Sequence, residues 1–338
     1  MTTETPKPNA VIAHIAGVRL FGDADMAHIA EVANVLDPEP IGDWAAPRAH
    51  ALLPDTEIVI GHWRCPPLDA AMLEQAPRLR LFAYAAGTVK DIVTDAVFDR
   101  KIRVTSGAKA NAEPVAEFTL AAILFAGKDA LWRRDRLRDP ALAGVRQHSD
   151  VMVGNWDKKI GIVGASMVGR RVIQLLHPFP HLEVLVYDPF LSEAEAAQIG
   201  VTKVELDELC ASVDVLSIHA PALPETEHMI GAAQLAALRT GATIINTARG
   251  SLIDQDALVA ELEAGRLHAV LDVTDPEPLP DEHPLLTLPT AFVTPHLAGS
   301  EGTELARMTD HVVKEIRRWI AGDPGNNEVH REHLSRLA

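Results

Sequence analysis

Three side chains that do chemistry in many enzymes stand at related places in the second half of the sequence. Arg249, Glu277 and His296 each lie at the end of an apolar run that is typical of a strand, or a few residues beyond it. In doubly wound folds the carboxyl ends of parallel strands face one crevice, and ligands bind there. We therefore expect the three side chains to meet.

A guanidinium, a carboxylate and an imidazole fit the interconversion of a 2-hydroxy acid and a 2-keto acid by hydride exchange with a nicotinamide. Arginine offers a planar fork of donors to the substrate's carboxylate and carbonyl oxygen. Histidine carries the proton, and a neighbouring carboxylate orients the imidazole and favours its protonated form. Taken singly, each residue also fits an ordinary surface position, and only the set of three indicates catalysis.

A glycine turn follows the apolar run 159–164 and precedes a helical segment. This order suits a pyrophosphate, because the amino end of a helix presents free N–H groups and a positive dipole end. The pattern is GxSxxG, and Ser166 stands where a glycine usually lets the backbone approach the phosphates. Ser166 either crowds the ligand or donates its hydroxyl to it, and a plain tight turn is the alternative interpretation.

Asp188 ends the next apolar run, about twenty residues after the glycine turn. An acid at this place accepts hydrogen bonds from an adenosine ribose and repels a 2′-phosphate. The sequence therefore favours NAD over NADP. A strand-terminal Asp that turns the chain before Pro189 is the simpler alternative.

Short apolar runs alternate with helical segments along most of the chain, which predicts an α/β fold. The expected strands cover residues 10–16, 56–62, 79–85, 101–106, 159–164, 183–188, 213–219, 242–248, 268–273 and 291–296. Runs without polar alternation indicate parallel sheets that are covered on both faces. The first four runs form a small α/β unit, and the last six form a doubly wound domain.

Helical patterns complete this organisation. Residues 113–128 are predicted to form a helix that links two domains, and 254–265 a helix between strands. The amphipathic stretch 301–321 ends at Gly322 and is expected to return to the first domain. Residues 129–157 have no clear period and suit a surface arm that packs on a second subunit. Trp63 and His62, after the second run, fit either a substrate pocket or the core.

Composition limits the class of protein further. The chain has 338 residues, which suggests two domains, and 31 Lys and Arg against 47 Asp and Glu give a net charge of −16. Such a charge disfavours nucleic acid and anionic membranes as partners. The two cysteines have no CxxC spacing, so we expect no disulfide framework and no metal site, and a cytoplasmic location. The longest clean apolar stretch, 118–126, is half the length of a membrane span.

From about Asp55 to Ala321 the sequence resembles the D-isomer-specific 2-hydroxyacid dehydrogenase family. Three blocks in order carry the resemblance: 238–258, 271–280 and 294–300. The resemblance implies that Arg249 binds the substrate, that Glu277 pairs with the histidine, and that His296 is the general acid/base. It also implies that Asp272 contacts the nicotinamide carboxamide.

The resemblance further implies two doubly wound domains, Rossmann-like and flavodoxin-like, with an NAD-binding domain over 111–298 inserted into a substrate-binding domain over 1–110 and 299–338. Dimers are usual in the family, so a homodimer is expected. The substrate carboxylate is held by the backbone of a loop that matches Ala86, Gly87, Thr88 and Val89. The expected cofactor-binding residues are Gly164, Ser166, Met167, Val168, Gly169, Asp188, His219, Ala220, Pro221, Thr247 and Asp272.

Two features refine the place in the family. The chain ends soon after the returning helix, so we expect no regulatory domain of the kind that long phosphoglycerate dehydrogenases carry. Glu277 with His296 argues against the formate dehydrogenase branch, which has Gln in place of Glu. The main alternative is a non-catalytic NAD-binding regulator, as in the related corepressors. A nucleotide-binding protein of other chemistry, such as methyl transfer, is disfavoured by Asp188 and the three late blocks.

Overall fold

The computed structural model describes residues 6–136 and 153–336, and the chain divides into two compact units. The first unit comprises Met1–Asn111 and Ser300–Ala338, and the second comprises Ala112–Gly299. Each boundary falls one residue after its expected position. The second unit is therefore inserted in the sequence of the first.

The first unit has a five-stranded parallel sheet with the order β2-β1-β3-β4-β5. This is the flavodoxin-like order, in which the direction of winding reverses between β1 and β3. The strands are β1 Asn9–Ala13, β2 Asn34–Val35, β3 Ile58–Gly61, β4 Leu81–Tyr84 and β5 Arg103–Ser106. The helices are α1 Asp23–Ala30, α2 Pro47–Leu52, α3 Ala70–Gln75, α4 Asp95–Asp99 and α12 Leu305–Ala321.

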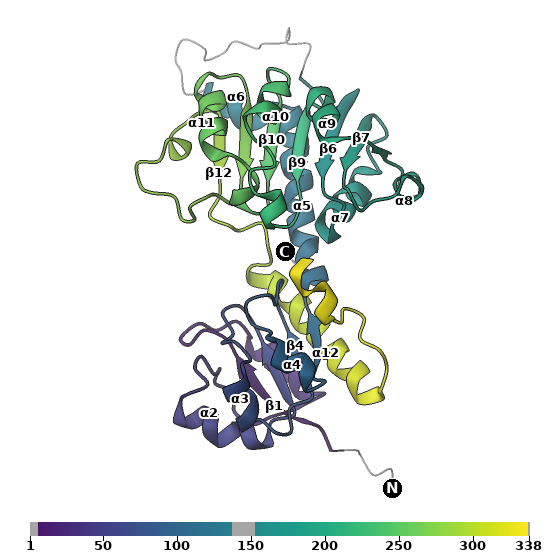
Figure 1. The fold of residues 1–338 in the computed structure, drawn as a ribbon. Coiled ribbons are helices and arrows are strands. Elements are labelled where there is room, and N and C mark those ends of the chain that lie inside the picture. The colour runs from purple at the N-terminus through teal and green to yellow at the C-terminus, as the bar shows by residue number, and fades with distance from the viewer. Residues whose placement is uncertain (1–5, 137–152, 337–338) are drawn as a thin grey trace. The chain divides into compact units, whose positions relative to one another are not determined.

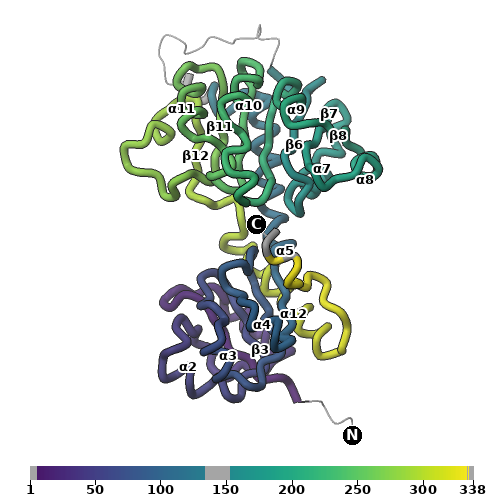
Figure 2. The backbone as a smooth tube through the Cα atoms, in the orientation of Figure 1, coloured from purple at the N-terminus to yellow at the C-terminus, as the bar shows by residue number. Residues whose placement is uncertain are grey.

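Both faces of this sheet are buried, because successive strand residues point to opposite sides. In β1, Val11 and Ala13 pack in the cluster that contains residues of α2, α3 and α4, whereas Ala10 and Ile12 pack against α1 and α12. Helix α12 ends at Gly322, whose φ of +77° is in the left-handed region. The predicted return of the C-terminal helix to the first unit is confirmed, and Figure 2 shows this yellow segment beside the strands of that unit.

The second unit has a seven-stranded parallel sheet with the order β12-β11-β10-β9-β6-β7-β8. The order reverses between β6 and β9, as in dinucleotide-binding folds. The strands are β6 Lys158–Val163, β7 Leu182–Tyr187, β8 Thr202–Lys203, β9 Val215–Ile218, β10 Thr243–Asn246, β11 His268–Leu271 and β12 Ala291–Val293. The helices are α5 Ala108–Gly127, which begins before this unit, α6 Ala130–Arg136, α7 Met167–Leu176, α8 Glu193–Gln198, α9 Leu206–Ser212, α10 Ala232–Ala237 and α11 Gln255–Glu263.

Helices cover both faces of the second sheet, so the predicted α/β class with doubly wound domains is confirmed (Figure 1). One buried cluster joins the strands to α9, α10 and α11, and the other joins them to α5 and α7. The short 3₁₀ segments are Leu53–Asp55, Pro224–Thr226, Gly250–Leu252, Pro284–Leu286, Gly302–Glu304 and Arg331–Arg336.

The expected strands are all present. Eight of them are shorter than their apolar runs, whereas β6 and β7 have the length of their runs and begin one residue earlier. The two-residue strands β2 and β8 were not predicted. Helix α5 begins five residues earlier than the predicted linking helix. Of the predicted arm, α6 lies within 129–136, and residues 137–152 lie outside the described residues. Across the described ranges, no helix combines the length and the apolar character that crossing a membrane requires.

Candidate active site

The glycine turn lies at the point where the order of the second sheet reverses. Gly164 follows β6 with φ of +95°, and a Cβ on it would come within 2.8 Å of the Ala220 amide nitrogen, beyond β9. A Cβ on Gly169 would come within 2.0 Å of the Gly164 carbonyl oxygen. Both positions therefore require glycine, and the turn is packed tightly against the loop that carries His219, Ala220 and Pro221.

Ser166 is the N-cap of α7, and its hydroxyl oxygen accepts a hydrogen bond from the Gly169 amide at 3.3 Å. Its backbone is extended, with φ of −68°, so the position has no need for glycine's conformational freedom. The first N–H groups of a helix lack partners within the helix, which leaves the amides of Met167 and Val168 to face a ligand. The hydroxyl proton of Ser166 also remains to donate. This donor set fits a pyrophosphate.

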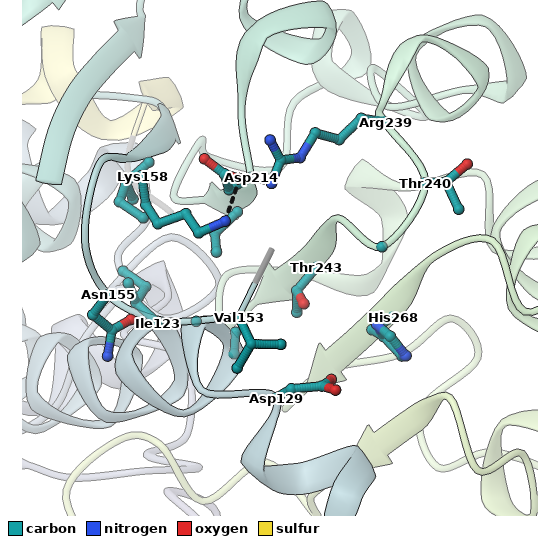
Figure 3. Close-up of a pocket in the computed structure, with 15 residues that line it drawn as sticks. Ile123, Asp129, Val153, Asn155, Lys158, Asp214, Arg239, Thr240, Thr243 and His268 are labelled. Atoms are coloured by element: carbon teal, nitrogen blue, oxygen red, sulfur yellow. Dashed lines mark hydrogen bonds and ion pairs between the residues drawn. The ribbon is translucent and has the colours of Figure 1, made fainter. Parts of the chain in front are cut away.

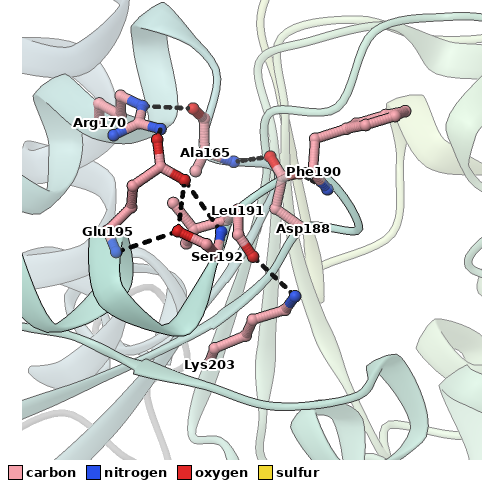
Figure 4. A network of polar contacts seen from close by, with 8 residues as sticks. All are labelled: Ala165, Arg170, Asp188, Phe190, Leu191, Ser192, Glu195 and Lys203. Atoms are coloured by element: carbon pink, nitrogen blue, oxygen red, sulfur yellow. Dashed lines mark hydrogen bonds and ion pairs between the residues drawn. The ribbon is translucent and has the colours of Figure 1, made fainter.

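Asp188 follows β7, beside the glycine turn (Figure 4). One of its carboxylate oxygens accepts from the Ala165 amide and the other from the Phe190 amide, each at 2.7 Å. Each oxygen keeps acceptor capacity, because a carboxylate has about four lone-pair sites. Arg170, in the first turn of α7, donates to the Ala165 carbonyl at 3.0 Å. The acid is thus held at the turn where a ribose is expected.

Two buried polar side chains lie beyond β9 and β10. His219 is hydrogen-bonded to Ser217 at 2.9 Å, and burial lowers the pKa of His219 to about 3, so the ring is neutral. Thr247 and Thr119 share a hydrogen bond of 3.1 Å between their hydroxyls. Both residues therefore lie at the carboxyl edge of the sheet with their side chains fixed.

Arg249, Glu277 and His296 converge within the second unit. The Nδ1 atom of His296 and the Oε1 atom of Glu277 are 2.6 Å apart. Burial lowers the pKa of Arg249, and the negative charge of Glu277 opposes that shift. The imidazole and the carboxylate are about half exposed, at 49% and 42%. With Nδ1 facing Glu277, the Nε2 atom of His296 remains to exchange a proton.

Three residues that the sequence did not single out position Arg249 and Glu277. The buried Asn246 side chain donates to the Arg249 carbonyl at 2.8 Å and accepts from the Ala248 amide at 3.0 Å. Gln255 bonds both the amide and the carbonyl of Asp275, two residues before Glu277. A Cβ on Gly250 would meet the Thr274 carbonyl at 2.1 Å. Gly250 thus lets the two loops pack together, a contact with no signature in a single sequence.

Asp272 holds the loop that carries His296. Its carboxylate accepts hydrogen bonds from the Thr294 hydroxyl at 2.6 Å and from the amides of Leu297 and Ala298 at 2.8 and 2.9 Å. His296 itself has φ of +56°, a conformation that costs a non-glycine residue roughly 1–3 kcal/mol. The three hydrogen bonds offset this cost. The structure thus gives Asp272 a positioning role for the histidine loop, beside its expected contact with the nicotinamide.

The predicted carboxylate-binding loop, Ala86 to Thr88, lies in the first unit beyond β4. Ser106 donates its hydroxyl proton to the Gly87 carbonyl, and the Thr88 hydroxyl accepts from the Lys90 amide at 3.3 Å. His62 and Trp63 follow β3 on the same edge. His62 is 1% exposed, and burial lowers its pKa to about 3, so it belongs to the core.

A cavity of about 250 Å³ lies at the amino ends of the strands of the second sheet (Figure 3). Lys158 and Asp214, which are 3.2 Å apart, stand at the starts of β6 and β9, and His268 stands at the start of β11. Arg239 also pairs with Asp214. Amino and carboxyl ends of parallel strands lie at opposite edges, so this cavity is separate from Arg249, Glu277 and His296.

The sheet order, the glycine turn at the reversal point and the adjacent acid define a dinucleotide-binding α/β protein. No cluster of three or more His, Cys, Asp or Glu side chains within the described ranges is placed to hold a metal ion. The protein-family model described as "D-isomer specific 2-hydroxyacid dehydrogenase, NAD binding domain" matches residues 120–298 of this chain. The chain belongs to the D-isomer specific 2-hydroxyacid dehydrogenase family, as its sequence resemblance indicated, and NAD is confirmed as the cofactor.

Individual relatives agree with this family. The chain is 33% identical over 285 residues to D-3-phosphoglycerate dehydrogenase of Mycobacterium bovis. The alignment covers 82% of this chain and 51% of that protein. It is 32% identical over 269 residues to glyoxylate reductase of Korarchaeum cryptofilum, covering 79% and 80%. A solved phosphoglycerate oxidoreductase from Rhizobium etli has the same fold, with a TM-score of 0.80 at 24% identity over 96% and 99% of the chains. The chain spans about half the length of the mycobacterial relative.

Proposed function

We propose that this protein is an NAD-dependent oxidoreductase that interconverts a 2-hydroxy acid and a 2-keto acid, and that it works chiefly as a 2-keto acid reductase. The observation that carries the proposal is the 2.6 Å contact between Glu277 and His296 beside the charged Arg249. A guanidinium and an acid/base pair at the carboxyl edge of a dinucleotide-binding sheet are what this reaction requires.

Each of the three residues has a separate role in the reaction. Arg249 donates to the carboxylate and the carbonyl oxygen of the substrate and polarises the carbonyl carbon. His296 gives a proton from Nε2 to that oxygen during reduction and takes it back during oxidation. Glu277 orients the ring and balances its positive charge. NADH supplies the hydride when it is bound.

In this proposal the second unit binds the cofactor and supplies Arg249 to the substrate, and the first unit supplies backbone donors for the substrate carboxylate. The helix N-terminus at Ser166 receives the pyrophosphate, and Asp188 receives the ribose and disfavours a 2′-phosphate. Backbone amides of Ala86, Gly87 and Thr88 bind the substrate carboxylate, in keeping with the family resemblance. A chain of net charge −16 needs such local donors to bind a small anion.

The test uses the purified chain with NADH and a panel of small, branched and aromatic 2-keto acids. Loss of the NADH absorbance with at least one acid is expected, and so is formation of the matching 2-hydroxy acid. NADH binding without turnover on any acid of the panel would contradict the proposal.

One observation supports a second candidate function, that of a non-catalytic NAD-binding regulator. Ser166 replaces a glycine of the cofactor turn, a change that acts on binding and not on chemistry. That candidate predicts tight NADH binding and no change in any activity for His296→Ala. The complete set of Arg249, Glu277 and His296 favours the enzyme, because a regulator needs no acid/base pair.

We also propose a homodimer in the cytoplasm. The homodimer is proposed because dimers are usual in the family. The free cysteines Cys65 and Cys210 are buried in different units, which suits a reducing compartment. Light scattering of the purified chain tests the homodimer. The expected mass is about twice the 36.5 kDa of one chain.

A further inference from the structure

A cation lies beside the acid that is proposed to bind the ribose of the cofactor (Figure 4). Ala165 connects the two side chains. Its amide donates to the Asp188 carboxylate at 2.7 Å, and its carbonyl oxygen accepts from the Nε atom of Arg170 at 3.0 Å. In dinucleotide-binding folds an arginine near this acid accommodates the 2′-phosphate of NADP. Arg170 is therefore placed to bind such a phosphate, and the partners of its guanidinium bear on the choice of cofactor.

A second carboxylate pairs with this cation. Glu195 lies on α8, and its Oε1 atom is 3.9 Å from the Nη2 atom of Arg170. The two side chains are 41% and 48% exposed, so a ligand from solution can reach them. Since the Nε atom of Arg170 donates to Ala165, two of the three guanidinium nitrogens face groups of the chain itself.

Glu195 is held in place by the amino end of its own helix. Its Oε2 atom accepts hydrogen bonds from the Ser192 amide at 3.0 Å and from the Ser192 hydroxyl at 2.8 Å. These bonds lower the pKa of Glu195, which is therefore charged at neutral pH. An exposed ion pair usually contributes little, because both side chains must be ordered to form it. In this pair Ser192 orders the acid and Ala165 orders the cation.

Two other cations of this region have different partners. The Nζ atom of Lys203 donates to the Leu191 carbonyl at 2.7 Å. Arg171, the next residue along α7, donates to Glu113 at 2.8 Å. Arg170 is thus the cation that contacts the glycine turn, and its neighbour Arg171 offers a matched comparison.

We infer that Glu195 is a second determinant of the preference for NAD over NADP, and that it acts by occupying Arg170. A 2′-phosphate carries a charge of about −2 and would have to displace Glu195 from the guanidinium while facing Asp188 as well. The ribose hydroxyl of NAD makes neither demand. Glu195 is a positioning residue, because it acts through Arg170. The inference rests on the proposed place of the ribose at Asp188 and adds a second acid to it.

The first test is Glu195→Gln, which removes the charge and keeps the helix cap, because glutamine also accepts from the Ser192 amide. Fluorescence titration with NADPH and with NADH gives the Kd of each. We expect the Kd of NADPH to fall about tenfold, because the phosphate gains a charge-assisted hydrogen bond, and the Kd of NADH to stay within about twofold. Glu193→Gln on the same helix is the matched control and should change neither Kd.

A second pair of variants tests whether the effect passes through Arg170. Arg170→Gln, added to Glu195→Gln, should return the Kd of NADPH at least to the wild-type value. Arg171→Gln in the same background removes an equal charge from the same helix, at a side chain that contacts Glu113. With this control the gain from Glu195→Gln should persist. Thermal unfolding of each variant checks that the second unit remains folded.

The possible failures are distinguishable. An unchanged Kd of NADPH in Glu195→Gln, or a gain that survives Arg170→Gln, would overturn the inference. Both results would leave the proposed reaction standing, since turnover of 2-keto acids tests that reaction separately. A wild-type chain that binds NADPH as tightly as NADH would overturn both the inference and the proposed role of Asp188 against a 2′-phosphate.

Discussion

The two units share an architecture but differ in what stands at the carboxyl edge of the sheet. In the second unit that edge carries Asp188, Arg249 and His296 at the ends of β7, β10 and β12. In the first unit the same edge carries two buried neutral histidines, His14 and His62. The difference shows that a parallel sheet supplies a place for a ligand, and that the residues in the loops beyond its strands determine whether chemistry can occur there.

The largest expected effect is on the proton transfer in the second unit. His296→Ala should lower kcat by roughly two to four orders of magnitude, because a positioned acid/base contributes that much. NADH affinity, measured by fluorescence titration, should stay within about twofold. His177→Ala, at the end of α7 and away from the site, is the control. Equal turnover in His296→Ala would exclude this residue as the acid/base.

The next effect concerns substrate binding. Arg249→Lys keeps the charge but loses the planar fork, so kcat/KM should fall roughly 10- to 100-fold. Much of the loss should appear in KM for the keto acid. Steady-state kinetics at saturating NADH measures it, and an unchanged KM and kcat would show that Arg249 lies outside the substrate contact.

A smaller effect is expected on the preference for NADH over NADPH. Asp188→Asn keeps an acceptor for the Ala165 amide but removes the negative charge, so the preference in kcat/KM for NADH over NADPH should fall about tenfold. Glu193→Gln on α8 removes a charge from the neighbouring surface and should change nothing. An unchanged preference in Asp188→Asn would refute the assignment of this acid to the ribose.

The smallest effect is on stability, and it is shared by the two units. His62 and His219 have folded pKa values of about 3, below the ordinary value of 6.5, so between these pH values the unfolded chain binds protons that the folded chain does not. Stability should therefore be full above pH 6.5 and fall as the pH drops toward 3, with each group contributing at most about 1.4 kcal/mol per pH unit. Urea unfolding at pH 7 and pH 5 measures this. In His62→Phe the loss of stability between these pH values should be smaller than in the wild-type chain, and an equal loss would contradict the account.

Much of this arrangement follows from local sequence. The uninterrupted apolar runs predict parallel strands, and Arg249 and His296 stand where such strands end. What escaped prediction depends on contacts between distant segments. Strands β2 and β8 have two residues each and exist only through pairing with β1 and β7. The close approach of Gly250 to Thr274 and the three bonds of Asp272 depend on how loops pack, which spacing along the chain does not encode.

By contrast, the glycines of the cofactor turn were predictable from the order of strand, turn and helix. Gly164 has φ of +95°, and a Cβ on Gly169 would meet the carbonyl oxygen of Gly164.

The most direct test of the central claim is to follow the hydride itself. The purified chain is incubated with a 2-keto acid and NADH that carries deuterium at the transferable position of the nicotinamide, and the product is analysed by mass spectrometry. We expect a 2-hydroxy acid with one deuterium at C2, formed at a rate that His296→Ala reduces at least a hundredfold. A chain that binds NADH and yields no deuterated product from any 2-keto acid would contradict the account.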